Sequence, residues 1–169
     1  VRHIVGVQFR NCATMGGSVW LRAGFSDPLT LLLAMDCTVE LYQGEDKLVQ
    51  IPIAEFCRQK PDNSILTAVH IQKTGRKIAY QSFRNTETDF PVLTAAVSVK
   101  DGKYCAAVGA RPMRAREVYA DNIPELIEQA KELSYQNNIR ASAEYRRMLS
   151  GVLIQRAADE LERIVTNGN

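Results

Sequence analysis

The sequence predicts an α+β fold with mostly antiparallel sheet, and two observations carry this prediction. Runs that alternate apolar and polar residues occupy most of positions 37 to 110, with turn residues between them. Helical periodicity dominates only after position 120. Strands that precede helices along a chain are typical of antiparallel sheets covered by helices.

The alternating runs predict six strands. Gly44-Glu45-Asp46 joins the first two runs into a hairpin, and Asp101-Gly102 joins the last two through the strongest hairpin turn in the sequence. The middle two runs flank Thr74-Gly75-Arg76, and we expect them to form a further antiparallel pair. The runs are residues 37–42, 48–51, 64–72, 77–83, 92–100 and 103–110.

Capping signals predict where the helices begin. Asp27 at an N-cap followed by Pro28 starts a short helix, and residues 53–57 form a single helical turn. Asn122 opens a second helix through a capping box with Glu125. The apolar face of that helix comprises Ile123, Leu126, Ile127, Ala130 and Leu133.

Ser142 caps a longer last helix, which we expect at residues 143–164. Its inward positions include Tyr145, Leu149, Val152 and Leu161. Several arginines lie on or beside this helix, namely Arg140, Arg146, Arg147 and Arg156. We expect an exposed, salt-bridged face with Glu144, Asp159 and Glu160 rather than a phosphate site.

The chain is expected to contain two units. Residues 1–74 form a small antiparallel sheet with short helices, and residues 75–169 form a three-stranded sheet packed with helices. The loose loop at residues 58–63 is the best linker candidate.

Composition limits the functions that the chain can have. Its 169 residues are 46% hydrophobic and 24% charged, and 21 basic and 19 acidic side chains give a net charge of +2. No run of like charges exceeds Arg146-Arg147, so neither a nucleic acid nor a membrane surface is an expected partner. No apolar stretch approaches the roughly 20 residues of a membrane span. The start without Met suggests a cleaved or truncated product, and we expect a soluble, cytoplasmic protein.

The cysteines and histidines form no metal-binding or catalytic pattern. Cys12, Cys37, Cys57 and Cys105 include no Cys-x-x-Cys pair, which argues against a zinc or iron–sulfur site and predicts reduced core thiols. His3 and His70 have no Ser, Cys or carboxylate at motif spacing, and His70 is expected to be structural.

Three other polar or aromatic positions are also assigned structural roles. Glu87 and Asp89 lie between two strands, where a solvated turn is expected rather than paired acid–base chemistry. Trp20 could stack near a ring system, but a single Trp is more often core filler.

The candidate binding segment is Thr14-Met15-Gly16-Gly17-Ser18, followed by Ser26-Asp27. Adjacent glycines let backbone N–H groups approach a pyrophosphate, and the hydroxyls of Thr14 and Ser18 can add hydrogen bonds. Asp27 suits ribose or ribityl hydroxyls, because an ionised acid only accepts hydrogen bonds. The alternative is that Gly-Gly is merely a turn.

The run from Val7 to Ser18 resembles the flavin-binding signature of the molybdopterin dehydrogenase flavoprotein family, where an Ile/Val-Arg-Asn stretch leads into Thr-Ile-Gly-Gly-Asn. The likeness continues through Ser26-Asp27 and residues 31–39, and Ser18 stands where the family usually has Asn. Segments that resemble the family's C-terminal domain are Tyr80 to Ala96, Ala107 to Pro112 and Ser142 to Arg147.

This resemblance implies the FAD-binding (medium) subunit of a molybdenum hydroxylase of the xanthine dehydrogenase or carbon monoxide dehydrogenase type. FAD would be held noncovalently, with Thr14, Gly16 and Gly17 at the pyrophosphate and Ser26 and Asp27 nearer the sugar or ribityl part. Electrons would arrive from iron–sulfur centres and pass to NAD or another acceptor. The partners implied are the iron–sulfur and molybdopterin subunits.

The family's N-terminal subdomain, which carries its own glycine-rich loop, is expected to be missing from this chain. The resemblance therefore implies an oxidoreductase component that is inactive in isolation. A competing hypothesis is a non-catalytic assembly module that docks the partner subunits and binds no flavin alone. A third is an unrelated phosphate-ligand binder that uses only the glycine pair.

Overall fold

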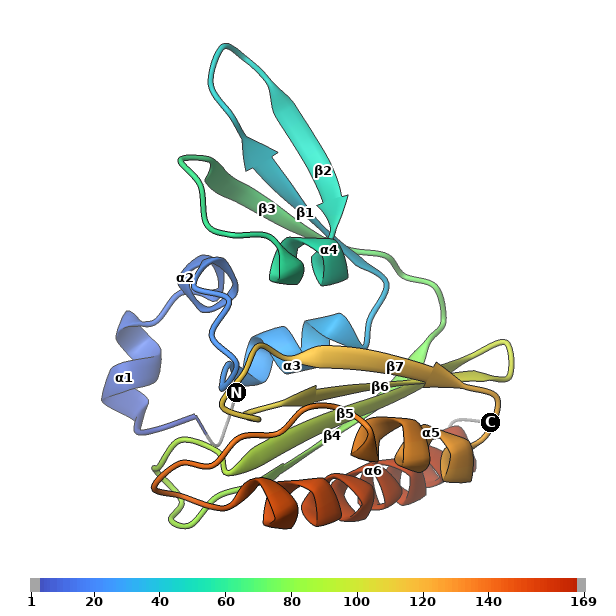
Figure 1. The fold of residues 1–169 in the computed structure, drawn as a ribbon. Coiled ribbons are helices and arrows are strands. Elements are labelled where there is room, and N and C mark those ends of the chain that lie inside the picture. Colours follow the sequence, from blue (N-terminus) through green and yellow to red (C-terminus); the bar gives the residue numbers. More distant parts are fainter. Residues whose placement is uncertain (1–3, 167–169) are drawn as a thin grey trace.

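A computed structural model describes residues 4–166, which form six helices and seven strands (Figure 1). In chain order these elements are α1 (Val7–Cys12), α2 (Met15–Trp20), α3 (Asp27–Leu33), β1 (Cys37–Tyr42), β2 (Leu48–Pro52), α4 (Ile53–Arg58), β3 (Ile65–Ile71), β4 (Lys77–Phe83), β5 (Leu93–Lys100), β6 (Lys103–Gly109), β7 (Arg116–Ala120), α5 (Ile123–Lys131) and α6 (Ala143–Thr166).

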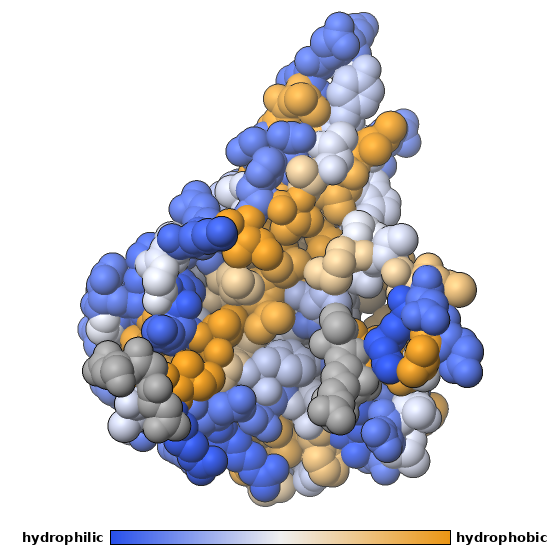
Figure 2. Space-filling model, turned by 180° about the vertical axis from the view of Figure 1, so that it is seen from behind, coloured by the Kyte–Doolittle hydropathy of each residue, from blue (hydrophilic) through white to orange (hydrophobic). Residues whose placement is uncertain are grey.

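The strands form two antiparallel sheets, which confirms the predicted α+β class. The smaller sheet has the order β2-β1-β3, and the larger has the order β4-β5-β6-β7. The β1–β2 hairpin projects from the body of the molecule (Figure 1). Seen from behind, hydrophobic side chains form a band that runs from this projecting sheet down to the body (Figure 2).

Helices cover both faces of the larger sheet (Figure 1). Leu93 and Val97 of β5 join the hydrophobic core under α5 and α6. Ala96, which points the other way, joins the core under α3. Successive strand residues face opposite sides of a sheet, so a strand covered on both sides is buried along most of its length.

The two predicted hairpins and the two C-terminal helix starts are confirmed. β1 pairs with β2, and β5 pairs with β6 up to the Lys100–Lys103 pair beside the Asp101-Gly102 turn. The backbone N–H of Glu125 donates to Asn122 Oδ1 over 2.9 Å. The backbone N–H of Tyr145 donates to Ser142 Oγ over 3.1 Å.

The predicted pairing of the middle two strands is wrong. β3 pairs with β1, and β4 pairs with β5, so the segment 72–76 crosses from one sheet to the other. Asp36 holds this crossing by accepting hydrogen bonds from Thr74 (2.7 Å), Arg76 (2.9 Å) and Lys100 (3.1 Å). The bond from Arg76 is the main reason that the pKa of Asp36 falls to about 2.

The larger sheet has four strands rather than the three expected. The missed strand, β7, is a five-residue edge strand that contains two charged residues and pairs with β6. The helices α1 and α2 were also missed, since the segment before Trp20 shows no long apolar periodicity and each helix has only six residues.

The loop at residues 58–63 does not link two units. It joins α4 to β3, and β3 pairs with β1 in the same sheet as β2, so the strands on both sides of the loop belong to the smaller sheet. The guanidinium of Arg114 donates to the backbone oxygens of Cys57 (2.9 Å) and Gln59 (2.7 Å). These bonds hold the start of the loop against the segment that joins β6 to β7. The predicted boundary near residue 74 stays a prediction.

The inward face of α6 differs from the prediction. Leu149 and Leu161 are buried as expected, but Tyr145 and Val152 are 37% and 41% exposed. Leu153 and Ile154 lie in the core instead. The buried stripe repeats every three or four residues from residue 146, which leaves positions 145 and 152 on its flank.

Arg146 is fully buried, so the predicted exposed arginine face is wrong at its centre. Its guanidinium donates to the backbone oxygens of Val92 (2.9 Å), Gln136 (2.7 Å) and Ala141 (2.7 Å), and to Asn138 Oδ1 (2.5 Å). Burial is the main cause that lowers the pKa of Arg146. The side chain therefore joins β5 to the loop before α6.

The neighbouring charges also differ from expectation. Arg140 pairs with Asp89 over 2.7 Å, so Asp89 is part of an ion pair rather than a purely solvated turn. Glu160 accepts a hydrogen bond from Gln81 rather than from an arginine. No helix within residues 4–166 has the length and apolar character needed to cross a membrane.

Candidate functional site

The two central glycines of the candidate segment lie in a helix and not in a turn. Thr14 is the N-cap of α2, and its Oγ1 accepts a hydrogen bond from the backbone N–H of Gly17 over 3.0 Å. Ser18 Oγ donates to the backbone oxygen of Thr14 over 3.0 Å. Both hydroxyls thus stabilise the first turn of α2, and the N–H of Gly17 is already paired.

Ser26, not Asp27, is the N-cap of α3. Ser26 Oγ accepts from the backbone N–H of Leu29 at 3.3 Å and donates to the backbone oxygen of Ser18 at 3.0 Å. Asp27 is the first helical residue, and Pro28 follows it in the first turn. The hydroxyl of Ser26 therefore ties the end of α2 to the start of α3.

Asp27 meets two donors from the larger sheet. Tyr80 of β4 donates its hydroxyl to Asp27 Oδ1. Arg84, directly after β4, donates Nη2 to the same oxygen over 2.5 Å. The side chains of Arg84 and Asp27 are only 9% and 12% exposed. Burial, followed by the charge of Asp27, raises the pKa of Tyr80 well above its usual range, so its phenol stays protonated.

These segments surround a cavity of about 480 Å³. Five of the six residues predicted for the site line it, namely Thr14, Gly17, Ser18, Ser26 and Asp27. Gly16 does not line the cavity, and a Cβ added there would meet no protein atom within 4 Å. A Cβ at Gly17 would lie 3.0 Å from Thr14 Oγ1. The two adjacent glycines therefore have different surroundings: Gly17 lines the cavity, whereas Gly16 does not.

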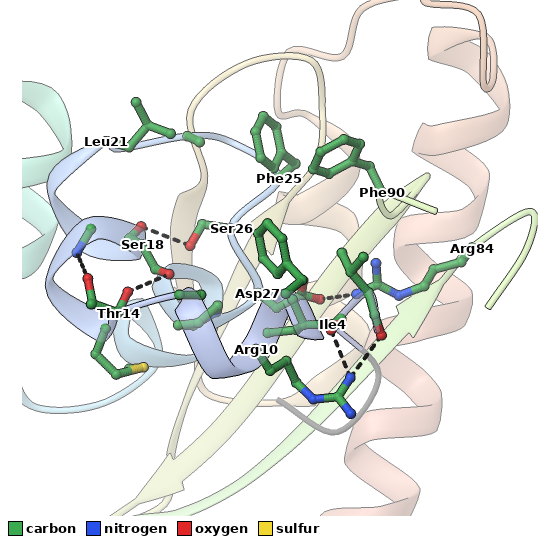
Figure 3. A pocket seen from close by; sticks show the side chains of 17 residues that line it. Ile4, Arg10, Thr14, Ser18, Leu21, Phe25, Ser26, Asp27, Arg84 and Phe90 are labelled. Atoms are coloured by element: carbon green, nitrogen blue, oxygen red, sulfur yellow. Dashed lines mark hydrogen bonds and ion pairs between the residues drawn. The ribbon is translucent and has the colours of Figure 1, made fainter. Parts of the chain in front are cut away.

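Apolar side chains make up much of the cavity wall (Figure 3). Phe25 and Phe90 pack edge to face with their ring centroids 4.6 Å apart, and they remain 43% and 46% exposed. In Figure 3 these rings lie at the far end of the cavity from Thr14, and Asp27 lies between. The cavity thus has hydroxyl groups at one end, a carboxylate in the middle and aromatic rings at the other end.

The larger sheet contributes residues to this site that the sequence did not predict. Arg84 and Phe90 line the cavity from the segment between β4 and β5, and Tyr80 supports Asp27 from β4. Arg10 lines it too, and its Nη1 donates to the backbone oxygens of Ile4 (2.9 Å) and Val5 (2.8 Å). Arg84 and Phe90 belong to the segment from Tyr80 to Ala96 that resembles the family. Their contact with the site could not be predicted, because this segment lies far from Asp27 in the sequence.

The remaining candidates lie outside the cavity. Trp20 packs near Phe56, with ring centroids 6.0 Å apart, which supports its core role. His70 Nε2 lies 3.3 Å from Glu40 Oε2 on the half-exposed face of the smaller sheet. His3 falls outside the described residues. No group of three or more His, Cys, Asp or Glu side chains within residues 4–166 could hold a metal ion.

All four cysteines are free thiols, but they are not all in the core. Cys37, Cys57 and Cys105 are buried as predicted, whereas Cys12 is exposed at the end of α1. Burial raises the pKa of Cys37 and Cys57 to about 11 and that of Cys105 to about 12. These three thiols are therefore poor nucleophiles at neutral pH.

The chain is similar to known proteins in sequence. Residues 1–74 match the family described as FAD binding domain in molybdopterin dehydrogenase. The chain is also 30% identical over 152 residues to the uncharacterized protein YgfM of Escherichia coli (strain K12), which covers 86% of this chain and 57% of that protein. The chain therefore spans little more than half the length of this relative.

Two solved structures share the fold. Cu,Mo-CO dehydrogenase in its cyanide-inactivated form has a TM-score of 0.81 at 20% identity, over 96% of this chain and 65% of that chain. Quinoline 2-oxidoreductase from Pseudomonas putida 86 has a TM-score of 0.80 at 18% identity, over 95% of this chain and 64% of that chain. At these identities the likeness establishes the fold alone.

Proposed function

We propose that the chain binds FAD noncovalently in the cavity beside α1, α2 and α3, on the premise that residues 1–74 match the family of FAD binding domains in molybdopterin dehydrogenase. The observation that carries the proposal is that five of the six residues of the family-like segment line a single cavity. Its volume of about 480 Å³ lies within the usual range for sites that bind small molecules or cofactors.

The groups around the cavity fit a dinucleotide that carries a polyol and an aromatic ring. Asp27 is an acceptor for sugar or ribityl hydroxyls, and Phe25 and Phe90 present apolar rings to a planar ligand group. Arg84 Nε is buried without a hydrogen-bond partner among the described residues, which leaves one donor beside the cavity unsatisfied. We assign the end of the cavity with Thr14, Gly17 and Ser18 to the pyrophosphate.

We propose that the chain is the electron-transfer component of a molybdenum hydroxylase. FAD, when bound, would carry electrons from iron–sulfur centres of a partner subunit to NAD or another acceptor. The protein's own residues would bind and orient the cofactor. The free thiols support a cytoplasmic location, where cysteines stay reduced.

The two glycines give a matched test. FAD is titrated against the wild-type chain and against Gly17→Val and Gly16→Val, with flavin fluorescence and visible absorption as readouts. Both variants place Val in the same turn of α2, but only Gly17 lines the cavity. We expect saturable binding by the wild-type chain, a loss of about tenfold or more in affinity for Gly17→Val, and a change below about twofold for Gly16→Val.

The opposite outcomes are also informative. A large loss in Gly16→Val alone would put the pyrophosphate on the outer side of α2 and contradict the cavity assignment. Absence of FAD binding by a folded wild-type chain would contradict the proposal.

A second candidate function is an assembly module that docks the iron–sulfur and molybdopterin subunits without binding flavin alone. Exposed apolar side chains favour it, because Phe9 and Leu21 at the cavity are 52% and 66% exposed and could meet a partner. It predicts a folded wild-type chain that binds no FAD but forms a complex with the partner subunits in size-exclusion chromatography.

A further inference from the structure

We propose that Tyr80 and Arg84 are positioning residues that orient Asp27, so that its second oxygen accepts a hydrogen bond from a sugar hydroxyl of the bound ligand. This inference rests on the proposed function and adds residues of the larger sheet to the binding site.

Both donors converge on one oxygen of the carboxylate. Tyr80 and Arg84 each donate to Asp27 Oδ1, from β4 and from the residue directly after it. Among residues 4–166, no side chain or backbone group donates to Oδ2 of Asp27. Because a carboxylate can accept on both oxygens, this arrangement fixes the group and leaves half of its accepting capacity for a ligand.

Two of the three nitrogens of the Arg84 guanidinium are engaged within the protein, and only Nε has no partner among the described residues. Its Nη2 is paired with Asp27 and its Nη1 donates to the backbone oxygen of Asp89 over 2.7 Å. Asp89 is held in turn by Arg140, whose Nε and Nη2 lie 3.1 Å and 2.7 Å from its carboxylate oxygens. The guanidinium of Arg84 is thus fixed at both ends, and its role is to hold Asp27.

The chemistry of Asp27 then selects the ligand group. An ionised carboxylate accepts but does not donate, so its partner must carry O–H or N–H. In Figure 3, Asp27 lies between the hydroxyl end and the aromatic end of the cavity, where a dinucleotide carries its sugar or polyol. The group recognised is therefore a sugar hydroxyl, either from the ribityl chain or from the ribose.

Paired ligands that differ only in these hydroxyls test the inference. Riboflavin is compared with lumiflavin, which lacks the ribityl chain, and adenosine is compared with 2′,3′-dideoxyadenosine. Each dissociation constant is measured by titration of the wild-type chain and of Asp27→Asn, Tyr80→Phe, Arg84→Met and Arg84→Lys. Tyr119→Phe is the control, since that tyrosine lies on the exposed edge strand β7.

We expect the wild-type chain to prefer the hydroxylated member of one pair by about tenfold or more, as for a hydrogen bond to a charged group. The pair that shows the preference identifies the source of the hydroxyl. Tyr80→Phe and Arg84→Met should reduce this preference severalfold while lumiflavin binding stays within about twofold. Arg84→Lys, which keeps a cation beside Asp27, should restore part of it.

Other outcomes separate the possible errors. If Tyr80→Phe and Arg84→Met weaken both members of each pair equally, the cluster is only structural and the inference is wrong. If every variant keeps the wild-type preference, Tyr80 and Arg84 do not position Asp27, whereas FAD binding and the proposed function stand. If the wild-type chain binds no flavin, both proposals are overturned.

Discussion

The two faces of the larger sheet are covered in different ways. Under α5 and α6, β5 presents Leu93 and Val97 to a closed apolar core. On the opposite face, Thr94 shares a hydrogen bond of 3.1 Å with Thr30 of α3, and Ser98 accepts one of 3.1 Å from Arg76. Both faces pack against a hydrophobic core, but the face toward α3 also carries these hydroxyl hydrogen bonds and lies toward the ion pairs, the sheet crossing and the cavity.

The difference teaches where substitutions should affect stability and where they should affect binding. Side chains under α5 and α6 have little room to move, because protein interiors are close-packed. The cavity side keeps large apolar side chains such as Phe9 and Phe90 in contact with solvent. Apolar surface that the fold leaves exposed can be buried by a ligand or a partner.

The largest expected effect is at Arg146. Arg146→Met removes four donated hydrogen bonds, including the buried one to the backbone oxygen of Val92, so we expect the free energy of unfolding to fall by about 3–5 kcal/mol. Arg147→Met is the control, since Arg147 is exposed, and its loss should stay below about 1 kcal/mol. Equal effects in urea unfolding would contradict the assigned burial.

A smaller effect distinguishes two neighbouring residues of α6. Leu153→Ala should lower the free energy of unfolding by about 3 kcal/mol, because the side chain is 1% exposed and its loss leaves a cavity. Val152→Ala should change it by less than about 1 kcal/mol. If Val152→Ala lowered the stability more than Leu153→Ala in thermal unfolding, the assignment of the inward face of α6 would be wrong.

The sheet crossing predicts a pH dependence. The pKa of Asp36 is lowered to about 2, so its contribution is present above its unfolded pKa near 4 and is lost as pH falls through about 2. Asp36→Asn should therefore reduce the free energy of unfolding by about 2 kcal/mol at pH 7, and the difference from wild type should shrink between pH 5 and pH 2. A difference that is constant with pH would contradict the ionic origin.

The smallest effect on stability is expected at the cavity. Phe90→Ala should lower the free energy of unfolding by only about 1 kcal/mol, because the half-exposed ring contributes mainly its edge-to-face contact with Phe25. The same change should reduce the fluorescence of an apolar dye bound to the cavity. Unchanged dye binding with a large loss of stability would make Phe90 part of the closed core.

Local signals were sufficient where neighbouring residues alone decide the structure. Asp101-Gly102 predicted its hairpin because both residues take the positive φ values that such a turn needs. Asn122 and Ser142 predicted their helix starts because a cap bonds to a backbone N–H only three residues away. Five of the six site residues predicted from the family-like segment likewise line the cavity.

Only the tertiary structure decided what distant segments do to one another. The alternation of β3 and β4 is the same whether they pair together or join different sheets, so strand partners depend on which edges remain free. The sequence alone predicts that Arg146 is exposed, but in the folded chain it is buried and donates to backbone oxygens of distant segments. Tyr80 and Arg84 reach Asp27 across more than 50 positions. By itself, the sequence determined the local turns, most of the caps and the family-like segment, because these depend on near neighbours. The fold determined the closed core and the oxygen of Asp27 to which no group within residues 4–166 donates.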